Sequence, residues 1–371
     1  MAITSLRIND FRNLAAVDVI PCVQGLNIIA GHNGSGKTSL LEAIHYLGLG
    51  RSFRSASSSR LIRHATDKFS VFAQLLSSGQ RDIPVGVERD THGIVRSRIA
   101  EKDAASVAEL AYLLPIRIIN SQSHQLFEAG PVFRRKYLDW GLFYHFDAFF
   151  LCWRQFERVL KQRNIVLRDQ LSRQELDVWT AELLKYSIEL DNFRRDYINM
   201  LQPVLAELTG ELLDMRNLEI HYSPGWDDSQ SFAEILASNY HQERRSGYTQ
   251  VGPHRADFDI RLDGISVKHF LSRGQQKLLI CAMILAQGML LAKCVNKSLI
   301  YLIDDLPSEL DLYSRQKLIS LLAKQPTQIF ITAVESETIC ALLNKSDVSL
   351  KVFHVEHGNV GAMAKDIASQ S

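Results

Sequence analysis

Eight residues near the N-terminus constrain the fold of this chain more than any other stretch. They follow an apolar run at 26–30 and precede a helical pattern at 39–44; their sequence is Gly31-His32-Asn33-Gly34-Ser35-Gly36-Lys37-Thr38. Glycines let the backbone turn its N–H groups toward an anion, and a following helix directs the positive end of its dipole there. A glycine-rich turn without a ligand is the structural alternative. The order of strand, loop, Lys-Thr and helix favours a P-loop, in which Lys37 contacts the β- and γ-phosphates and Thr38 binds Mg²⁺.

Length and composition are typical of a globular protein with two domains, or with one domain and a large insertion. The chain has 371 residues and a formal net charge of +1, so any contact with nucleic acid must come from local basic patches. Its five cysteines are scattered and form no CxxC motif, which indicates buried thiols rather than disulfides or a zinc site. Residues 1–10 predict a strand rather than a signal peptide, and no uninterrupted apolar run of about 18 residues occurs. We therefore expect a soluble cytoplasmic protein.

Two stretches with strand patterns flank a helical middle region. Alternation at 3–11 and β-like runs at 69–76 and 83–100 predict a small antiparallel sheet beside the P-loop, followed by a helix at 104–114 and a strand at 116–119. Strands at 257–262, 298–303, 328–332 and near 348–355, with helices at 274–293 and 312–323, predict a mostly parallel, buried sheet. The resulting prediction is an α/β fold with one ATPase domain made of 1–130 and 247–371, and a helical insertion at 131–246.

The insertion carries a basic stripe. Long helical patterns at 153–168 and 174–212 predict a helical hairpin or arm. On the first helix the side chains opposite the apolar face are Arg154, Arg158, Lys161 and Arg168, whereas Arg163 projects toward the apolar side. This stripe is either a solvated helix face or a surface that spans DNA phosphates without reading bases. The aromatic residues of this region, Trp140, Trp153, Phe149 and Phe150, fit a hydrophobic core better than base stacking.

Two acids end the apolar strand Leu302-Ile303-Asp304-Asp305. Two carboxylates that merely cap a strand end are the structural alternative. Downstream of a P-loop, the first acid suits a Mg²⁺ ligand that acts with Thr38 and the phosphates. The second, Asp305, suits a general base that polarises the attacking water.

A further segment, Leu271-Ser272-Arg273-Gly274-Gln275-Gln276-Lys277, opens the helix at 274–293. Ser272 is a good N-cap, so an ordinary helix start accounts for it alone. However, the order of P-loop, Ser-x-Gly-Gln and Asp-Asp resembles the ATP-binding-cassette class, and Ser308-Glu309-Leu310-Asp311 resembles the D-loop of that class. The resemblance implies that Ser272, Gly274 and Gln275 of one subunit meet the nucleotide of the other, that Asp311 contributes there, and that ATP joins a homodimer.

The resemblance narrows to the RecF family and covers essentially the whole chain. It is carried by motifs that include 10–13, 31–38, 50–55, 61–64, 130–140, 160–164, 252–257, 271–277 and 302–311. It implies an α/β fold with a P-loop ABC-type ATPase head, a mixed sheet and an inserted helical arm domain, with ATP and Mg²⁺ as cofactors and Arg12 at the nucleotide. It also implies an ATP-dependent dimer in the cytoplasm, associated with the nucleoid, that binds double-stranded DNA and ds–ss junctions at gaps. With RecR and RecO, such a protein promotes RecA loading.

The chain departs from the family pattern at three places. Asn120-Ser121-Gln122 stands where a Pro and an acid are usual, although Gln122 still suits a Mg²⁺ ligand or a residue that orients water. Thr332-Ala333-Val334 occupies the place of the cassette switch histidine, and Asp305 is one methylene shorter than the Glu that is common in transporters. These features predict a weak, DNA-dependent ATPase that acts as a slow switch.

Other interpretations stay open at this point. An ABC transporter ATPase subunit requires a switch histidine and a shorter insert. A nucleotide-gated DNA scaffold with incidental hydrolysis is compatible with every motif above. A second basic cluster after the P-loop helix, made of Arg51, Arg54, Arg60 and Arg63, is a candidate for DNA, nucleotide or local ion pairs.

Overall fold

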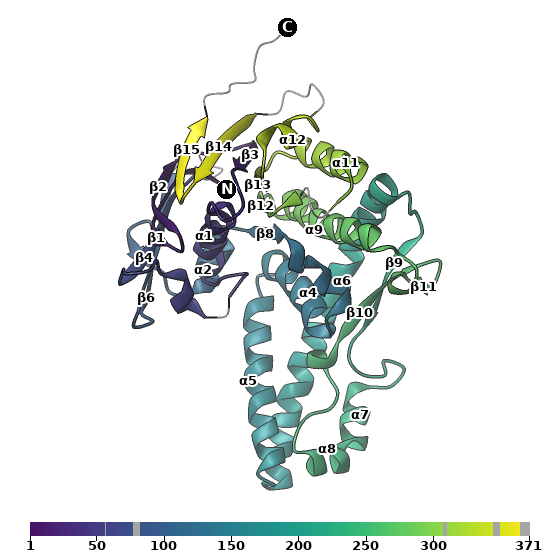
Figure 1. Cartoon of the computed structure of the whole chain (residues 1–371). Helices are drawn as coiled ribbons and strands as arrows, with labels where there is room; N and C mark the ends of the chain where they lie inside the picture. Colours follow the sequence, from purple (N-terminus) through teal and green to yellow (C-terminus); the bar gives the residue numbers. More distant parts are fainter. Residues whose placement is uncertain (56, 77–81, 307–309, 344–348, 364–371) are drawn as a thin grey trace. The chain divides into compact units, whose positions relative to one another are not determined.

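The computed structural model describes residues 1–55, 57–76, 82–306, 310–343 and 349–363 (Figure 1). The predicted turn at 78–79 and the predicted D-loop residues Ser308 and Glu309 lie outside these ranges. The chain forms two compact units. The first comprises 1–123 together with 296–371, and the second comprises 124–295.

An antiparallel sheet forms one wall of the first unit. Its strand order is β2-β1-β4-β5-β6-β7. Alternating burial along β1 and β4 places one face of the sheet in the core, as expected for a sheet covered on one side. The predicted antiparallel sheet is thus confirmed, with these strand bounds: β1 Ala2–Phe11, β2 Leu14–Val19, β4 Lys68–Leu76, β5 Asp82–Asp90, β6 Val95–Ile99 and β7 Lys102–Asp103.

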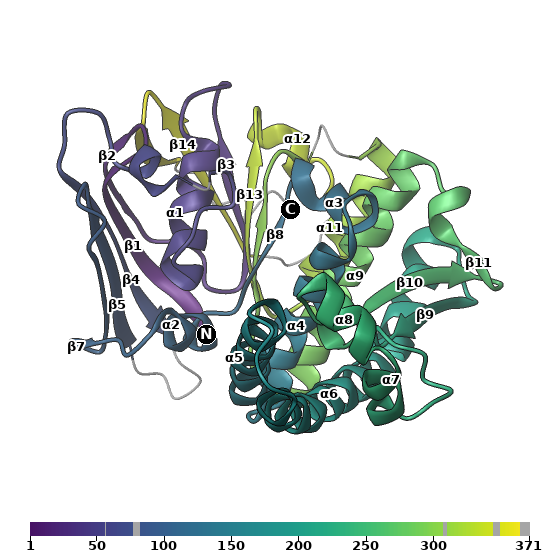
Figure 2. The same ribbon diagram turned by 90° about the horizontal axis from the view of Figure 1, so that it is seen from below.

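A second sheet, with order β15-β14-β3-β13-β12-β8, forms the opposite wall (Figure 2). Neighbouring strands in this sheet are parallel, except that the edge strand β15 runs antiparallel to β14. The predicted buried, mostly parallel sheet is therefore confirmed. β15 was not predicted, because its five residues contain only one β-branched side chain. The strand bounds are β3 Gly25–Ala30, β8 Ile116–Ile119, β12 Ile300–Ile303, β13 Gln328–Ala333, β14 Leu350–Glu356 and β15 Asn359–Met363.

Helix α1 (Lys37–Leu49) lies between the two sheets (Figure 2). Ten of its thirteen residues are buried, and Leu40, Leu41 and Ile44 share one hydrophobic core with residues of both sheets. This packing fixes the start of α1, and therefore the P-loop, against the carboxyl end of β3. Other helices in the described part of this unit are α2 Val107–Leu113, α11 Leu312–Ala323 and α12 Ser336–Cys340, with a short 3-10 turn at Ser58–Leu61.

The second unit contains the predicted helical arm. Helices α5 (Phe149–Arg168) and α6 (Arg173–Leu213) run side by side and are joined by residues 169–172 (Figure 1). A capping box between Ser172 and Glu175 begins α6 and limits the connection to four residues. The other elements are α3 Gln125–Glu128, α4 Pro131–His145, β9 Leu218–Ser223, α7 Phe232–Ser238, α8 Tyr240–Ser246, β10 Asp257–Leu262, β11 Ile265–Ser266 and α9 Arg273–Val295.

The units are divided at positions other than the predicted 130 and 247. β10 pairs with β9 along its whole length, and Arg134 at the start of α4 forms an ion pair of 2.6 Å with Asp257 on β10. The Tyr137 hydroxyl donates to Met283 O at 2.8 Å, which attaches α9 to α4. These long-range contacts place β10 and α9 in the second unit, although their patterns resemble those of the ATPase domain.

Helix α9 is long and apolar enough to cross a membrane, with a mean hydropathy of 2.1 over its most apolar window. However, 72% of that window is buried inside the structure, and buried residues continue from Leu278 to Gly288. We therefore interpret α9 as the core helix of its unit.

Candidate nucleotide-binding site

The P-loop connects β3 to α1 in a conformation that requires glycine at two positions. Gly31 has φ +153°, and a Cβ built on it would lie 2.2 Å from the carbonyl oxygen of Val355. Gly36, the N-cap of α1, has φ +122°. The loop backbone is held by two hydrogen bonds to Ser35 O, one from Gly358 N at 2.9 Å and one from Asn13 Nδ2 at 3.1 Å. The loop is thus preformed around the start of α1.

Lys37 bends back over the loop. Its Nζ donates to the carbonyl oxygens of Gly31 at 2.7 Å and His32 at 2.9 Å. Partial burial lowers the pKa of Lys37, and the carboxylates of Asp305 and Asp304 oppose that shift. Both loop bonds go to neutral carbonyls, so the ammonium charge is available to an anion held by the loop.

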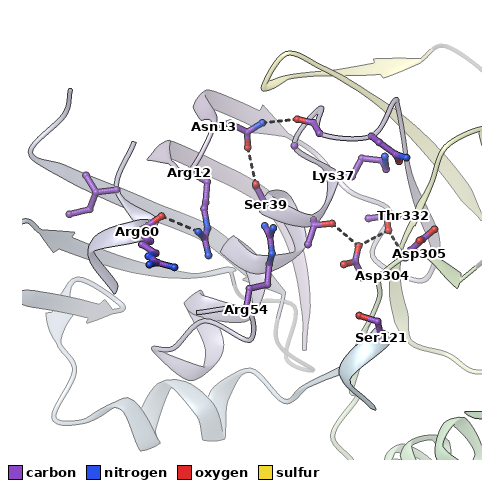
Figure 3. Close-up of a pocket in the computed structure, with 15 residues that line it drawn as sticks. Arg12, Asn13, Lys37, Ser39, Arg54, Arg60, Ser121, Asp304, Asp305 and Thr332 are labelled. Carbon is purple, nitrogen blue, oxygen red and sulfur yellow. Dashed lines mark hydrogen bonds between the residues drawn. The ribbon is translucent and has the colours of Figure 1, made fainter. Parts of the chain in front are cut away.

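The two acids meet the P-loop through Thr38. Asp304 Oδ1 accepts hydrogen bonds from Thr38 Oγ1 at 2.9 Å and from Thr332 Oγ1 at 2.8 Å (Figure 3). The same Thr332 hydroxyl accepts from the backbone N–H of Asp305 at 2.8 Å. Desolvation by burial raises the pKa of Asp304, and the two threonine bonds only partly offset it. A carboxylate that is buried in this way favours a cationic ligand.

Together these groups line a pocket of about 570 Å³ (Figure 3). Its walls come from the P-loop, α1, the ends of β12 and β13, and the segment after α1; among them are Arg12, Asn13, Ser39, Arg54, Arg60 and Ile62. The Ser35 hydroxyl is buried, and the described residues offer it no hydrogen-bond partner. Positive-φ glycines, a lysine on the loop and an orphaned hydroxyl fit the phosphates of a nucleoside triphosphate.

The part of the pocket at Thr38 and Asp304 can hold Mg²⁺ only if phosphate oxygens complete its coordination. Among the described residues, no group of three or more His, Cys, Asp or Glu side chains is placed to hold a metal by itself. Thr38 and Asp304 supply two oxygen ligands, and Mg²⁺ in nucleotide sites usually takes few protein ligands besides phosphates and water.

Arg12 lies in the pocket wall, and a buried acid fixes it there. Its guanidinium donates to both oxygens of Glu42, at 2.9 and 2.7 Å, and to Arg60 O at 3.1 Å. Glu42 lies on α1 and is fully buried. It also accepts a short bond from Ser52 and lies 3.6 Å from Arg54. Glu42 thereby links Arg12 to the segment after α1.

The predicted residue Gln122 does not line the pocket. Gln122 is exposed, and it is its neighbour Ser121 that lines the pocket. The 3-10 turn Ser121–His124 begins immediately after β8, and Asn120 holds it through a bond from Gln122 N to Asn120 Oδ1 at 3.1 Å. This turn places Ser121, rather than Gln122, in the pocket wall. The role expected for Gln122, as a Mg²⁺ ligand or a residue that orients water, stays a prediction.

The Ser-x-Gly-Gln segment forms an exposed helix start, as expected if Ser272 is an ordinary N-cap. Gln275 N donates to Ser272 Oγ at 3.3 Å, and Gln275 Oε1 accepts from Ser272 N at 3.0 Å, which is a capping-box geometry. Gly274 is exposed, and a Cβ built on it meets no atom within 4 Å. Asp311 likewise caps α11, where its carboxylate accepts from Ser314 N at 3.0 Å, a bond that lowers its pKa. Both segments stay predictions for a dimer contact.

The basic stripe on α5 is exposed along its length, at Arg154, Arg158, Lys161 and Arg168. Arg163 is only 1% exposed and donates to Thr180, Thr249 and Glu243. Its role in the arm is structural, which explains its departure from the stripe.

Several pocket residues escaped the sequence interpretation. Asn13 donates to the loop backbone and accepts from Ser39 Oγ at 2.8 Å, and Thr332 joins the two acids. The available signal for Thr332 was a polar residue at the end of an apolar strand beside the acid-bearing strand. Arg54 and Arg60, from the basic cluster, prove to line the pocket, whereas Arg63 pairs with Asp10 at 3.4 Å.

The chain is similar over its whole length to a known family of proteins. A family model for the RecF/RecN/SMC N terminal domain matches residues 2–360. DNA replication and repair protein RecF of Cellvibrio japonicus (strain Ueda107) is 40% identical over 366 residues, covering 98% of this chain and all of that protein. DNA replication and repair protein RecF of Shewanella denitrificans is 42% identical over 360 residues, covering 97% and 99%.

Solved structures show the same fold. One described as the recombination mediator protein RecF-ATP in the RecFOR pathway has a TM-score of 0.84 at 25% identity and covers 98% of both chains. An SMC head bound to the C-winged helix domain of ScpA has a TM-score of 0.62 at 14% identity, covering 99% and 98%. The chain therefore belongs to the RecF family and has the fold of an ABC/SMC-type ATPase.

Proposed function

We propose that this chain is an ATP-dependent, DNA-binding recombination mediator. It dimerises on ATP, binds DNA at single-strand gaps and ds–ss junctions, and with RecR and RecO promotes RecA loading during repair and replication restart. It works in the cytoplasm in association with the nucleoid. Family membership over the whole chain supports the pathway, since relatives are named for replication and repair and one solved relative for RecF-ATP in the RecFOR pathway.

The bond from Thr38 Oγ1 to Asp304 Oδ1 is the observation that carries the ATP proposal. It brings the hydroxyl after the P-loop lysine to the acid at the end of β12, where both can share one cation. Bound Mg²⁺ supplies charge neutralisation between the phosphates and this acid. Lys37 and Arg12 bind the triphosphate from the loop and the pocket wall, and the N-terminus of α1 orients it.

Slow hydrolysis is expected from the groups around Asp305. Asp305 is the candidate general base, and Lys37 stabilises charge on the phosphates. The stretch Thr332-Ala333-Val334 occupies the place of a switch histidine, and the Thr332 hydroxyl already contacts Asp304 and the Asp305 backbone. A threonine hydroxyl is too weak an acid and too weak a base to take part in general acid–base catalysis near neutral pH, so slow hydrolysis acts as a timer. A dimer-dependent turnover well above about 10 s⁻¹, the typical enzyme median, contradicts this expectation.

A composite site accounts for the exposed start of α9. In the proposed dimer, the N-terminus of α9 with Ser272, Gly274 and Gln275 meets the nucleotide of the second copy, and Asp311 approaches from the D-loop. The exposure of these residues in the single chain supports a contact that forms only in the dimer. DNA then contacts the stripe of Arg154, Arg158, Lys161 and Arg168, through phosphates alone.

Sedimentation velocity with and without ATP tests the proposal, on wild type and Ser272→Arg. Wild type is expected to dimerise with ATP, and the variant is expected to bind ATP as a monomer. Absence of an ATP-induced dimer in wild type excludes the composite site. In the same samples, DNA binding should require ATP, and replacing Arg154 and Arg158 should make log affinity less dependent on log salt.

Incidental hydrolysis is the second candidate, favoured by the occupied Thr332 hydroxyl. Asp305→Asn separates the two roles. A scaffold keeps DNA repair in cells that carry this variant, whereas a cycling switch loses it while its ATP-induced dimer persists.

A further inference from the structure

The far end of the helical arm carries a basic groove. The α5–α6 connection lies beside α8 (Figure 1). The groove between them has a volume of about 830 Å³. The lining residues are Gln170–Arg173 from the connection and Tyr240, His241, Arg244 and Arg245 from α8. None of these residues belongs to the P-loop, the Ser-x-Gly-Gln segment or the stripe.

The groove is a built structure. Arg244 donates to the carbonyl oxygens of Leu171 at 2.8 Å and Gln170 at 3.2 Å, and Gln170 Nε2 donates back to Arg244 O at 3.1 Å. The guanidinia of Arg173 and Arg244 lie over the Tyr240 ring, 5.0 and 6.0 Å from its centroid. Tyr240 in turn packs against a small core of Val166, Leu167 and Leu176. Several contacts therefore preorganise the basic side chains.

Its charge is largely uncompensated. Arg244 binds neutral carbonyls, and Arg245 is exposed and forms no ion pair within the described part of the chain. The nearby acids serve other groups: Glu175 caps α6, Glu243 is buried with Arg163, and Asp169 pairs with Arg168 at 3.1 Å. Asp177 lies 3.8 Å from Arg173, and both are exposed, so that pair contributes little.

We propose that this arm-tip groove binds the phosphodiester backbone of DNA. Guanidinium groups bind phosphates in a bidentate manner and carry no sequence preference there. Because two guanidinia already lie over Tyr240, we assign the ring no role in base stacking. The inference rests on the proposed DNA-binding function and extends it to a site beyond the stripe.

Continuity with the stripe favours a long polyanion over a short acidic peptide. The stripe runs from Arg154 to Arg168, fourteen residues or about 21 Å along α5. Its last member adjoins α8, since a Cβ built on Gly247 would lie 3.5 Å from Arg168 Cα. Each strand of duplex DNA presents a charge about every 3.4 Å of the helix axis, so such a row of cations can follow one backbone.

The test compares the salt dependence of ATP-dependent binding to a labelled duplex. Arg173→Gln/Arg245→Gln is set against Arg216→Gln/Lys293→Gln, which removes two exposed charges elsewhere in the same unit. Each lost phosphate contact should make the slope of log affinity against log salt less steep by about 0.9. We expect a change of about 1.8 for the groove pair and none for the control pair. Arg245→Gln alone, which alters no described contact, should change the slope by about 0.9.

Each outcome decides between the claims. If wild type binds DNA with ATP and both groove variants keep its slope, the groove inference is wrong and the proposed function stands. If wild type binds no DNA, both are wrong. If the groove variants keep the DNA slope but lose binding of a labelled poly-glutamate peptide, the groove recognises an acidic protein surface instead.

Discussion

The Thr332 hydroxyl donates a 2.8 Å hydrogen bond to Oδ1 of Asp304, the same oxygen that accepts from Thr38. Two threonines, one on α1 and one on β13, thus hold one partly buried carboxylate at the end of β12. Desolvation nevertheless dominates, because the pKa of Asp304 is raised. The site therefore keeps a charge that destabilises the ligand-free fold.

We predict that Asp304→Asn raises the Tm of the nucleotide-free protein at neutral pH. A carboxylate with a raised folded pKa is most favourable below its unfolded pKa, and its ionisation destabilises the fold as pH rises through the folded pKa. The difference in Tm between variant and wild type should therefore be largest near pH 7 and disappear below about pH 4. Thermal unfolding across this range measures it.

The same variant should lose stabilisation by Mg²⁺ and ATP. A ligand at 100 times its Kd stabilises the native state by about 2.7 kcal/mol, which raises the Tm of wild type only. Lys37→Ala is the matched control, because it removes triphosphate contacts and leaves Asp304 in place. If ligand-free Asp304→Asn has a lower Tm than wild type at pH 7, the inference that the Asp304 charge destabilises the ligand-free fold is wrong.

We predict that Glu42→Gln weakens both the fold and ATP binding. Glu42 is fully buried and holds Arg12 through two bonds, with Ser52 as a further donor. Breaking a buried ion pair costs about 3–5 kcal/mol, and the lower end applies here because Arg12 is partly exposed. Denaturant unfolding and titration with a fluorescent ATP analogue measure the two effects. Glu88→Gln, which breaks an exposed pair with Lys68, should cost less than about 1 kcal/mol.

The sequence predicted the parts of the site whose chemistry is local. The P-loop glycines, Lys37, Thr38 and the two acids at the end of β12 each belong to one short stretch in which spacing and residue type suffice. Arg12 and Glu42 are thirty residues apart, and an acid within an apolar helix gives no sign of its partner. Gln122 does not line the pocket, because the direction of a one-turn helix depends on its capping contacts. β10 pairs with β9 and lies in the second compact unit, and strand partners across a long loop leave no periodic pattern in the sequence.

We predict that Arg163→Met destabilises the arm by about 3–5 kcal/mol, because it leaves the Glu243 carboxylate buried without its cation. Arg163→Met/Glu243→Leu should recover most of this loss, since a well-packed apolar pair replaces the ion pair. Urea unfolding measures both variants. The exposed neighbour Arg158→Met should stay within about 0.5 kcal/mol of wild type. Equal losses in the single and double variants contradict a charge-burial mechanism.

We predict that Gly274→Ala separates the fold of α9 from its role at a second subunit. Gly274 lies in the first turn of α9 with open space around it, and alanine is favoured over glycine in helices by up to about 1 kcal/mol. The variant should therefore unfold at the same or a higher temperature than wild type. At a nucleotide phosphate, by contrast, the added methyl group occupies space that the proposed contact needs. ATP-induced dimerisation, measured by sedimentation velocity, should weaken at least tenfold, which corresponds to about 1.4 kcal/mol. If the variant dimerises normally, the start of α9 is only a helix cap and does not contribute to the ATP site.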